Sequence, residues 1–327
     1  MTASDQSLLV TGGSGALGSR VLRVLATADA APSIVIASRS EPAALPTALI
    51  GGRYWPLDLE RDIVLPEGTA TVLHIAGEKR DEKRMWAIND AGTRRLIAAA
   101  ARAGARRFVH ISSVGVYGAP PRTQLVDTTH ARTPRNVYEA SKNAAEAAVR
   151  ELCPQLGIEF MVVQPTNVLA PSVGVSYPLL GLMSAIQSGR FAYLGRHDAW
   201  LNYVHVDDVA SAIAAVVASG TNGATYIVNT PARMSAIAGW IADELGVPAP
   251  TRRFPAWLGA LAGHTGSALQ RAARRSMPFT TERYAELTNA TRYDDVALRE
   301  ALGLRYPIGI EAAVRSLVAA YRAEGRL

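Results

Sequence analysis

The sequence of 327 residues predicts an α/β fold, in which a doubly wound parallel sheet carries a smaller, mainly helical lobe. Short apolar stretches alternate with helix-periodic stretches from residue 7 to residue 165, which is the order of βαβ units. The short stretches are continuous apolar runs, as is typical of parallel strands that are buried on both faces. After Pro165 the alternation stops, and Pro and Gly recur without a period through residues 171–200, which favours a second lobe.

The elements follow in chain order. Strands are predicted at 7–12, 33–38, 70–77, 107–113 and 158–165, and helices at 15–28, 85–104 and 136–153. A strand–helix–strand return is predicted over 203–229, and an amphipathic helix near 310–324. We therefore expect a larger lobe of residues 1–168 plus 201–232 and a smaller lobe of residues 169–200 plus 233–327.

Composition excludes several classes of protein. The 49% hydrophobic and 19% charged residues describe an ordinary globular chain. The net charge of +6 is spread over scattered arginines, which indicates solvated helix faces and no nucleic-acid partner. A single cysteine, Cys153, allows no internal disulfide and no cysteine-based zinc site, so we expect no metal. No signal peptide and no apolar run of about 20 residues is evident, so we expect a cytoplasmic protein with no membrane partner.

The stretch "TGGSGALG" places glycines at 12, 15 and 18, between the first predicted strand and the first predicted helix. A phosphate can approach backbone that carries no Cβ, and the start of the helix offers unpaired N–H groups. In the first βα turn of an alternating chain, this spacing predicts dinucleotide binding. The predicted contacts are Gly12, Gly15, Ala16, Leu17 and Gly18.

The residues after the second strand bear on the choice of dinucleotide. NAD-binding folds usually carry an acidic residue there, which binds the ribose hydroxyls. This sequence has Ser38 followed by Arg39. A hydroxyl and a guanidinium suit a 2′-phosphate, so we expect NADP(H) to be preferred over NAD(H).

A tyrosine and a lysine four residues apart, Tyr138 and Lys142, lie in the predicted helix 136–153. Lysine occurs only at 79, 83 and 142, although Lys and Arg together number 34, so a lysine here indicates a need for a compact ammonium. The two side chains share one helix face, and a nearby ammonium lowers the pKa of a phenol. This pair therefore predicts an acid/base tyrosine, with Lys142 also able to bind a ribose.

Together, "TGGSGALG", "HIAG", "ISSVGVYG" and "YEASK" resemble the extended short-chain dehydrogenase/reductase family, also called the NAD-dependent epimerase/dehydratase family, over roughly Leu8 to Ala215. The resemblance implies a Rossmann-type dinucleotide-binding domain for the larger lobe and a substrate-binding role for the smaller one. It implies Tyr138 as acid/base, Lys142 as its partner, and Ser113 as the hydroxyl that polarises the carbonyl, with Ser112 beside it. A homodimer is also an expectation from the family.

Further segments resemble cofactor-binding and substrate-binding segments of the family. The resemblance implies cofactor contacts from Asp58, Leu59, Ala76, Gly77, Lys79, Ser112, Pro165 and Val168, and a substrate contact from Asn167. Asn89 matches another family position. The alternatives are that Asp58 caps a turn, that Asn89 braces a strand end and that Asn167 only satisfies backbone.

Departures from the family pattern bear on the substrate. Val114 and Gly115 stand where sugar-nucleotide dehydratases carry an acidic pair, and Leu201 stands where many sugar-nucleotide members carry a diphosphate-binding arginine. The stretch "FPAWLGALAGHTG" (254–266) adds apolar residues that either pack in the smaller lobe or contact substrate. The leading hypothesis is an NADP(H)-dependent oxidoreductase that interconverts a ketone and a secondary alcohol on a fairly apolar small molecule, with Leu201 near it. The alternatives are a sugar-nucleotide epimerase or reductase, and a non-catalytic dinucleotide-sensing scaffold.

Overall fold

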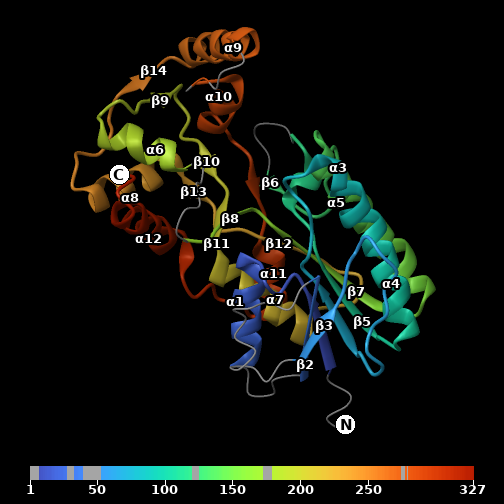
Figure 1. Cartoon of the computed structure of the whole chain (residues 1–327). Helices are drawn as coiled ribbons and strands as arrows, with labels where there is room; N and C mark the ends of the chain where they lie inside the picture. The colour runs from blue at the N-terminus through green and yellow to red at the C-terminus, as the bar shows by residue number, and fades with distance from the viewer. Residues whose placement is uncertain are drawn as a thin grey trace.

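The computed structural model describes residues 7–27, 33–39, 53–119, 125–171, 179–273, 277 and 279–327 (Figure 1). Its centre is a sheet of seven strands, all paired in parallel, and this confirms the predicted doubly wound α/β fold. In sheet order the strands are β12 (Thr225–Val228), β7 (Glu159–Pro165), β5 (Arg107–Ile111), β4 (Thr71–His74), β1 (Ser7–Thr11), β2 (Ser33–Ser38) and β3 (Arg53–Pro56). The strand order reverses between β1 and β4.

Helices cover both faces of this sheet (Figure 1). One face carries α1 (Ala16–Ala26), α7 (Val206–Ser219) and α11 (Val296–Leu302); the other carries α3 (Glu82–Met85), a π-helical turn η2 (Trp86–Ala91), α4 (Gly92–Arg102) and α5 (Val137–Gln155). On β1, Leu8 and Val10 pack with α1 and α7, whereas Leu9 packs with α4 and α5. Because successive side chains of a strand point to opposite faces, one apolar run supplies both cores.

A smaller lobe lies beyond the carboxyl ends of the strands (Figure 1). Its apolar core joins α6, α8 and α12 through residues such as Met183, Ile237 and Leu317. The lobe and its junctions contain α6 (Leu179–Gln187), α8 (Met234–Leu245), α9 (Ala256–Ala273), α10 (Thr281–Leu287), α12 (Gly309–Ala323) and the paired short strands β8 (Asn167–Leu169) with β11 (Tyr203–His205), β9 (Tyr193–Leu194) with β14 (Arg253–Phe254), β10 (Trp200–Leu201) with β13 (Ala232–Arg233), and β6 (Leu125–Val126) with β15 (Arg292–Tyr293).

The apolar cores mix residues from the two predicted lobes at two places, and the division into lobes itself stays a prediction. Leu201 and Tyr203 were expected in the larger lobe, but they lie in the core of the smaller one. Conversely, Leu298 of α11 was expected in the smaller lobe, but it packs in the core of the larger one. Helix α11 packs against β12, the strand at the edge of the sheet, and so buries the apolar face of that strand.

Local elements also differ from expectation. The predicted helix 85–104 begins at Glu82 and contains the π-helical turn, and strand β3 was not predicted. The predicted strand 70–77 ends at His74, so Ala76 and Gly77 belong to a loop. Within the irregular stretch 171–200, residues 172–178 lie outside the described residues, and α6 follows them.

The single cysteine, Cys153, lies on the inner face of α5. Its side chain is buried among residues of the second core. Burial raises the pKa of its thiol to about 12. Because the thiolate is the reactive form, this cysteine is chemically inert near neutral pH.

Candidate active site

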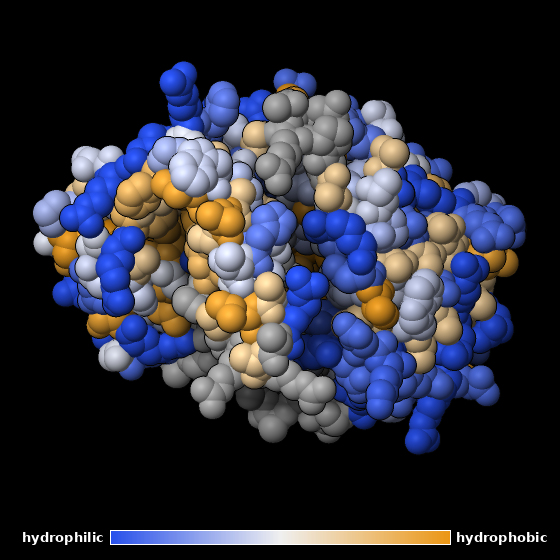
Figure 2. All heavy atoms as spheres, turned by 90° about the horizontal axis from the view of Figure 1, so that it is seen from above, coloured by the Kyte–Doolittle hydropathy of each residue, from blue (hydrophilic) through white to orange (hydrophobic). Residues whose placement is uncertain are grey.

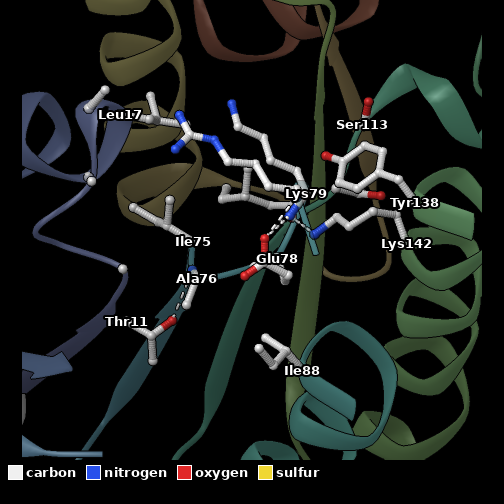
Figure 3. Close-up of a pocket in the computed structure, with 18 of the residues that line it drawn as sticks. Thr11, Leu17, Ile75, Ala76, Glu78, Lys79, Ile88, Ser113, Tyr138 and Lys142 are labelled. Atoms are coloured by element: carbon white, nitrogen blue, oxygen red, sulfur yellow. Dashed lines mark hydrogen bonds between the residues drawn. The ribbon is translucent and has the colours of Figure 1, made fainter. Parts of the chain in front are cut away.

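A cleft follows the carboxyl ends of the central strands, where the strand order reverses. Its volume is about 1250 Å³. The first βα turn, the loops after β2, β4, β5 and β7, and the start of α5 form its walls (Figure 3). Open α/β sheets bind ligands at this switch point, so the cleft is the candidate site.

The cleft brings together nearly all the site residues that the sequence predicts. Those that line it are Gly12, Gly15, Ala16, Leu17, Gly18, Ser38, Arg39, Asp58, Leu59, Ala76, Gly77, Lys79, Ser112, Ser113, Tyr138, Lys142, Pro165, Asn167 and Val168. They come from seven separate segments, so their convergence is a property of the fold. Their contacts with a ligand stay predictions.

Leu201 is the exception among the predicted site residues. It is buried in the core of the smaller lobe and does not line the cleft. Its short strand β10 pairs with β13, and this pairing places Leu201 opposite Ala232. A substrate contact from Leu201 is therefore not part of the proposals below.

The glycine turn after β1 is built by close backbone approaches. Gly12 has a φ of 73°, in the left-handed region that favours glycine, and a Cβ there would lie 2.6 Å from the backbone N of Ala76. A Cβ on Gly18 would lie 2.1 Å from the carbonyl oxygen of Gly12. Gly15 is the N-cap of α1, and no side chain caps this helix start. The turn therefore forms a cradle whose walls are backbone, open to a phosphate group.

Gly18→Ala should disturb this turn, because its new methyl group would overlap backbone that cannot rotate away. Overpacking of this kind lowers the free energy of unfolding by roughly 1–3 kcal/mol, and because it displaces the backbone that would hold the phosphate, we expect dinucleotide affinity to fall by on the order of tenfold. Isothermal titration with NADPH measures this. Gly239→Ala in α8 is the matched control, since a Cβ there meets nothing within 4 Å. Equal affinities of the two variants would contradict the role of Gly18.

The loops after β2 and β3 form one end of the cleft. Ser38 and Arg39 line it together with Asp58. The pKa of Glu60 is lowered, mainly by the hydrogen bond from Arg84 and in smaller part by the charge of Arg39, so Arg39 acts at this end of the cleft. The carboxylate of Asp58 accepts a hydrogen bond from the backbone N of Glu60 at 3.0 Å and so caps this turn, while a cofactor contact from Asp58 stays a prediction.

Asn89 braces the loop after β4 rather than lining the cleft. Its Oδ1 accepts from the backbone N of Glu78 at 2.8 Å, and its Nδ2 donates to the carbonyl of Glu78 and to Oγ of Ser141, each at 2.9 Å. The π-helical turn that carries Asn89 gives it this reach. Lys79 lies in the same loop and is exposed in the cleft (Figure 3).

Three polar side chains converge on one wall of the cleft: Ser113, Tyr138 and Lys142 (Figure 3). Ser113 follows β5 and accepts a hydrogen bond from the backbone N of Gly115 at 3.1 Å, which caps the short helix η3 (Val114–Tyr117). Tyr138 and Lys142 lie one turn apart on α5, as their spacing predicts. The ammonium of Lys142 donates to the carbonyl of Ile111 at 2.5 Å. This arrangement presents a phenol, a hydroxyl and an ammonium to the same space.

The protonation of these groups differs in part from expectation. Burial raises the pKa of Tyr138, a hydrogen bond with Ser113 lowers it, and the charge of Glu139 raises it, with a raised pKa as the result. We expected Lys142 to bring this pKa towards neutrality, but its ammonium is directed to the carbonyl of Ile111. Burial lowers the pKa of Lys142 itself to about 8, against an opposing effect of Glu146.

A buried network lies behind Lys142. Glu146 follows Lys142 by one turn of α5, and its side chain is 0% exposed. One carboxylate oxygen accepts from Nε2 of Gln164 at 2.6 Å, and the other lies 2.5 Å from Nη1 of Arg132. The amide oxygen of Gln164 in turn accepts from the hydroxyl of Tyr117 at 2.7 Å. Glu146 therefore fixes this part of α5 and supplies negative charge near the Lys142 ammonium.

Sequence reasoning missed two carboxylates that organise the site. Glu146 could have been found, since it stands four residues after Lys142 on the same helix face. Glu78 could not: its Oε1 accepts from the backbone N of Lys79, Arg80 and Asp81 at 2.9, 2.8 and 3.2 Å. Such a backbone nest leaves no pattern in side-chain types.

Comparison with known proteins gives a family match. A model described as "NAD dependent epimerase/dehydratase family" matches residues 8–229. That range includes the glycine turn, all seven strands of the central sheet, and the wall that carries Ser113, Tyr138 and Lys142. The match therefore covers the whole candidate site.

Three curated proteins and one solved structure extend the comparison. The chain is 28% identical to sterol demethylase protein B of Methylococcus capsulatus, over 98% of this chain and 99% of that one. It is 31% identical to GDP-6-deoxy-D-mannose reductase of Pseudomonas aeruginosa (68% and 74% covered). It is 26% identical to 4-hydroxy-2-methyl-3-oxo-4-farnesyl-3,4-dihydroquinoline-1-oxide ketoreductase of Stigmatella aurantiaca (89% and 90%). The structure of RMD from Pseudomonas aeruginosa complexed with NADPH shares the fold, with a TM-score of 0.67, 23% identity, and 97% and 99% covered.

Proposed function

We propose that this chain, which belongs to the NAD dependent epimerase/dehydratase family, is an NADP(H)-dependent oxidoreductase that interconverts a ketone and a secondary alcohol on a fairly apolar small molecule. Membership makes it an NAD(P)-dependent enzyme of the oxidoreductase type. The observation that carries the finer proposal is the convergence of Ser113, Tyr138 and Lys142 on one wall of the cleft that begins at the glycine turn.

The residues of the cleft fit a dinucleotide. The glycine turn is held by close backbone approaches that a Cβ at Gly12 or Gly18 would break, and it leads into the start of α1, which no side chain caps, as a pyrophosphate site requires. Ser38 and Arg39 would hold the adenosine ribose with its phosphate, and Tyr138 and Lys142 the ribose of the nicotinamide. When bound, the nicotinamide ring supplies the hydride in reduction or accepts it in oxidation.

The chain's own residues would handle the proton. The raised pKa of Tyr138 keeps its phenol protonated at neutral pH, so in reduction the phenol donates that proton to the substrate oxygen. The Ser113 hydroxyl donates a hydrogen bond to the same oxygen and stabilises its developing negative charge. Lys142, one turn away, would turn from the carbonyl of Ile111 to stabilise the phenolate that proton donation leaves. Oxidation of the alcohol runs these steps in reverse.

NADPH affinity should fall as the pH rises through about 8, the pKa of Lys142. Below that pH the ammonium is protonated and can donate to the ribose, and above it the charge is lost. Fluorescence titration of NADPH at pH values on both sides of the pKa measures the change. The Lys142→Met variant should bind NADPH weakly at every pH and show no such fall in affinity near pH 8. A fall that persists in this variant would contradict the assignment to Lys142.

Arg39→Ala should weaken NADPH binding far more than NADH binding. The lost guanidinium–phosphate contact at an exposed site is worth on the order of 1.5–3 kcal/mol. Isothermal titration of both dinucleotides with wild type and variant gives the difference directly. Tighter binding of NADH than of NADPH by the wild type would reverse the proposed preference.

The proposal of an apolar substrate rests on missing acidic residues after Ser113 and on apolar residues in the lining of the cleft. Val114 and Gly115, which follow Ser113, supply no acidic pair for dehydration. The residues that line the cleft include Val168, Ala170 and Tyr203, whose side chains offer apolar surface. Two of the relatives, a sterol demethylase protein and a ketoreductase of a farnesylated ring, carry names that support this class.

A sugar-nucleotide reductase or epimerase is the second candidate, favoured by the 31% identity to GDP-6-deoxy-D-mannose reductase. The test is the nucleotide that co-purifies with the protein, followed by two assays. NADPH oxidation is measured with hydrophobic ketones and with keto sugar nucleotides, and epimer formation, which consumes no NADPH, is measured with GDP-, UDP- and dTDP-sugars. Turnover of hydrophobic ketones supports the proposal. Turnover of sugar nucleotides alone supports the second candidate, and binding without any turnover supports a dinucleotide-sensing scaffold.

A further inference from the structure

Helix α9 carries a cluster of large apolar side chains that are open to solvent. Trp257 is 65% exposed and Leu261 is 58% exposed, and Leu258, Leu269 and the adjacent Phe254 of β14 are exposed as well. Figure 1 shows α9 at the tip of the smaller lobe, and Figure 2, seen from that end, shows hydrophobic residues at the lobe's surface. No residue of α9 lines the cleft described above. The cluster thus needs an explanation other than substrate binding.

The opposite side of α9 explains why this side faces outward. Gly259, Gly263 and Gly266 are buried, and a Cβ on them would meet Leu194, Thr280 and Phe279, respectively, at 2.6, 3.1 and 1.9 Å. The helix therefore packs on α10 and the chain before it through its glycines. At about 100° per residue, seven exposed residues of α9 form one arc of roughly 140°. We call this arc the α9 face: Trp257, Leu258, Leu261, Ala262, Thr265, Ala268 and Leu269.

Thr265 is the one polar residue of the α9 face, and its hydroxyl is turned back to the helix. It donates to the carbonyls of Leu261 and Ala262, each at 3.0 Å. The hydroxyl therefore needs no hydrogen bond to water, and the whole α9 face can be buried without leaving the Thr265 hydroxyl unsatisfied.

Positive charge surrounds the α9 face. Residues 245–281 include five arginines (Arg252, Arg253, Arg271, Arg274 and Arg275) and no Asp or Glu. Of the three that the structure describes, Arg252 and Arg253 precede the helix and Arg271 lies in its last turn. They donate hydrogen bonds to the carbonyls of Gly189, Gly195 and Ser267, and within the described part of the chain none of the three pairs with a carboxylate. Arginines without a carboxylate partner among the described residues therefore lie at both ends of α9.

We propose that the α9 face docks the protein on an anionic lipid surface, with the helix lying flat at the interface. Trp, Phe and Leu side chains on one face with arginines beside them are the composition of interfacial helices, and each cation near an anionic bilayer adds attraction. Among the described residues no helix is both long and apolar enough to cross a bilayer, so this is surface attachment. The proposal goes beyond the oxidoreductase function, and it revises the sequence-based expectation of no membrane partner.

A second copy of this chain is the rival occupant. A symmetric dimer through the α9 face would bring the same arginines of two copies together, because a two-fold contact uses the same patch on both subunits. Like charges without acidic partners oppose that contact. An anionic surface instead complements them.

Vesicle flotation tests the proposal with the full chain. The protein is mixed with vesicles of phosphatidylcholine alone, and with vesicles in which half of the lipid is phosphatidylglycerol. We expect flotation with the anionic vesicles only, and its loss when salt screens the charges. Trp257→Ser/Leu261→Ser and Arg252→Gln/Arg271→Gln should each weaken binding by on the order of tenfold or more.

The matched control is Val64→Ser/Leu156→Ser, which removes two exposed apolar side chains of the larger lobe, 73% and 46% exposed. It should float like the wild type. Circular dichroism and NADPH binding should be unchanged in all three variants, since none of these residues lines the cleft. No flotation, equal flotation on neutral vesicles, or α9 variants that float like the control would each overturn the proposal. So would light scattering that shows a dimer which only the α9 variants dissociate.

Discussion

Tyr138→Phe should lower kcat by about 10² or more, because the variant keeps the ring but has no proton to donate to the substrate oxygen. Affinity for NADPH should stay close to that of the wild type, since the cradle at the glycine turn is untouched. Steady-state kinetics on a substrate from the ketone panel give kcat, and isothermal titration gives the affinity.

The control for this variant is Tyr226→Phe, which also removes one tyrosine hydroxyl. Tyr226 lies on β12 and its hydroxyl accepts from the backbone N of Thr221 at 2.9 Å, away from the cleft. Its kcat should match that of the wild type. If Tyr138→Phe turns over as fast as Tyr226→Phe, another group donates the proton and the proposed mechanism fails.

Glu146→Ala should lower the free energy of unfolding by about 3–5 kcal/mol, the range found when one partner of a buried ion pair is removed. The substitution leaves the guanidinium of Arg132, 22% exposed, without its carboxylate and removes the acceptor of the Gln164 amide. Chemical denaturation followed by circular dichroism measures the loss.

Glu151→Ala is the matched control on the same helix. Its carboxylate is 57% exposed and lies 3.7 Å from Arg94, and a surface pair of this kind contributes at most about 1 kcal/mol. Equal losses from the two variants would contradict the structural role of Glu146. Glu146→Gln tests the effect of this carboxylate on Lys142. Because the charge of Glu146 raises the pKa of Lys142, its removal should move the fall in NADPH affinity to lower pH.

Much of the larger lobe is readable from sequence, because its signals are local. Continuous apolar runs gave the inner strands, and the glycine spacing gave the turn after β1. Tyr138 and Lys142 could be paired because helical spacing alone puts them on one face. β3 was missed since its four residues, "RYWP", show neither an apolar run nor an alternation.

The remaining features depend on contacts between segments far apart in sequence. A substrate contact was expected from Leu201 because of its place in the sequence pattern, but the pairing of β10 with β13 places it in the core of the smaller lobe. The direction of the Tyr138 pKa depends on how deeply α5 packs and on where the Lys142 ammonium finds an acceptor. The apolar residues of 254–266 could not be assigned to core or surface until the glycines of α9 showed which side packs.

The inert thiol of Cys153 makes this protein well suited to site-directed labelling. Since the only native cysteine is buried and its pKa is raised to about 12, maleimide dyes should leave the wild type almost unlabelled. A cysteine introduced at an exposed position of either lobe would then be the single reactive site. Donor and acceptor dyes on two such cysteines, one in each lobe, would measure the separation of the lobes by energy transfer as NADPH and substrate bind.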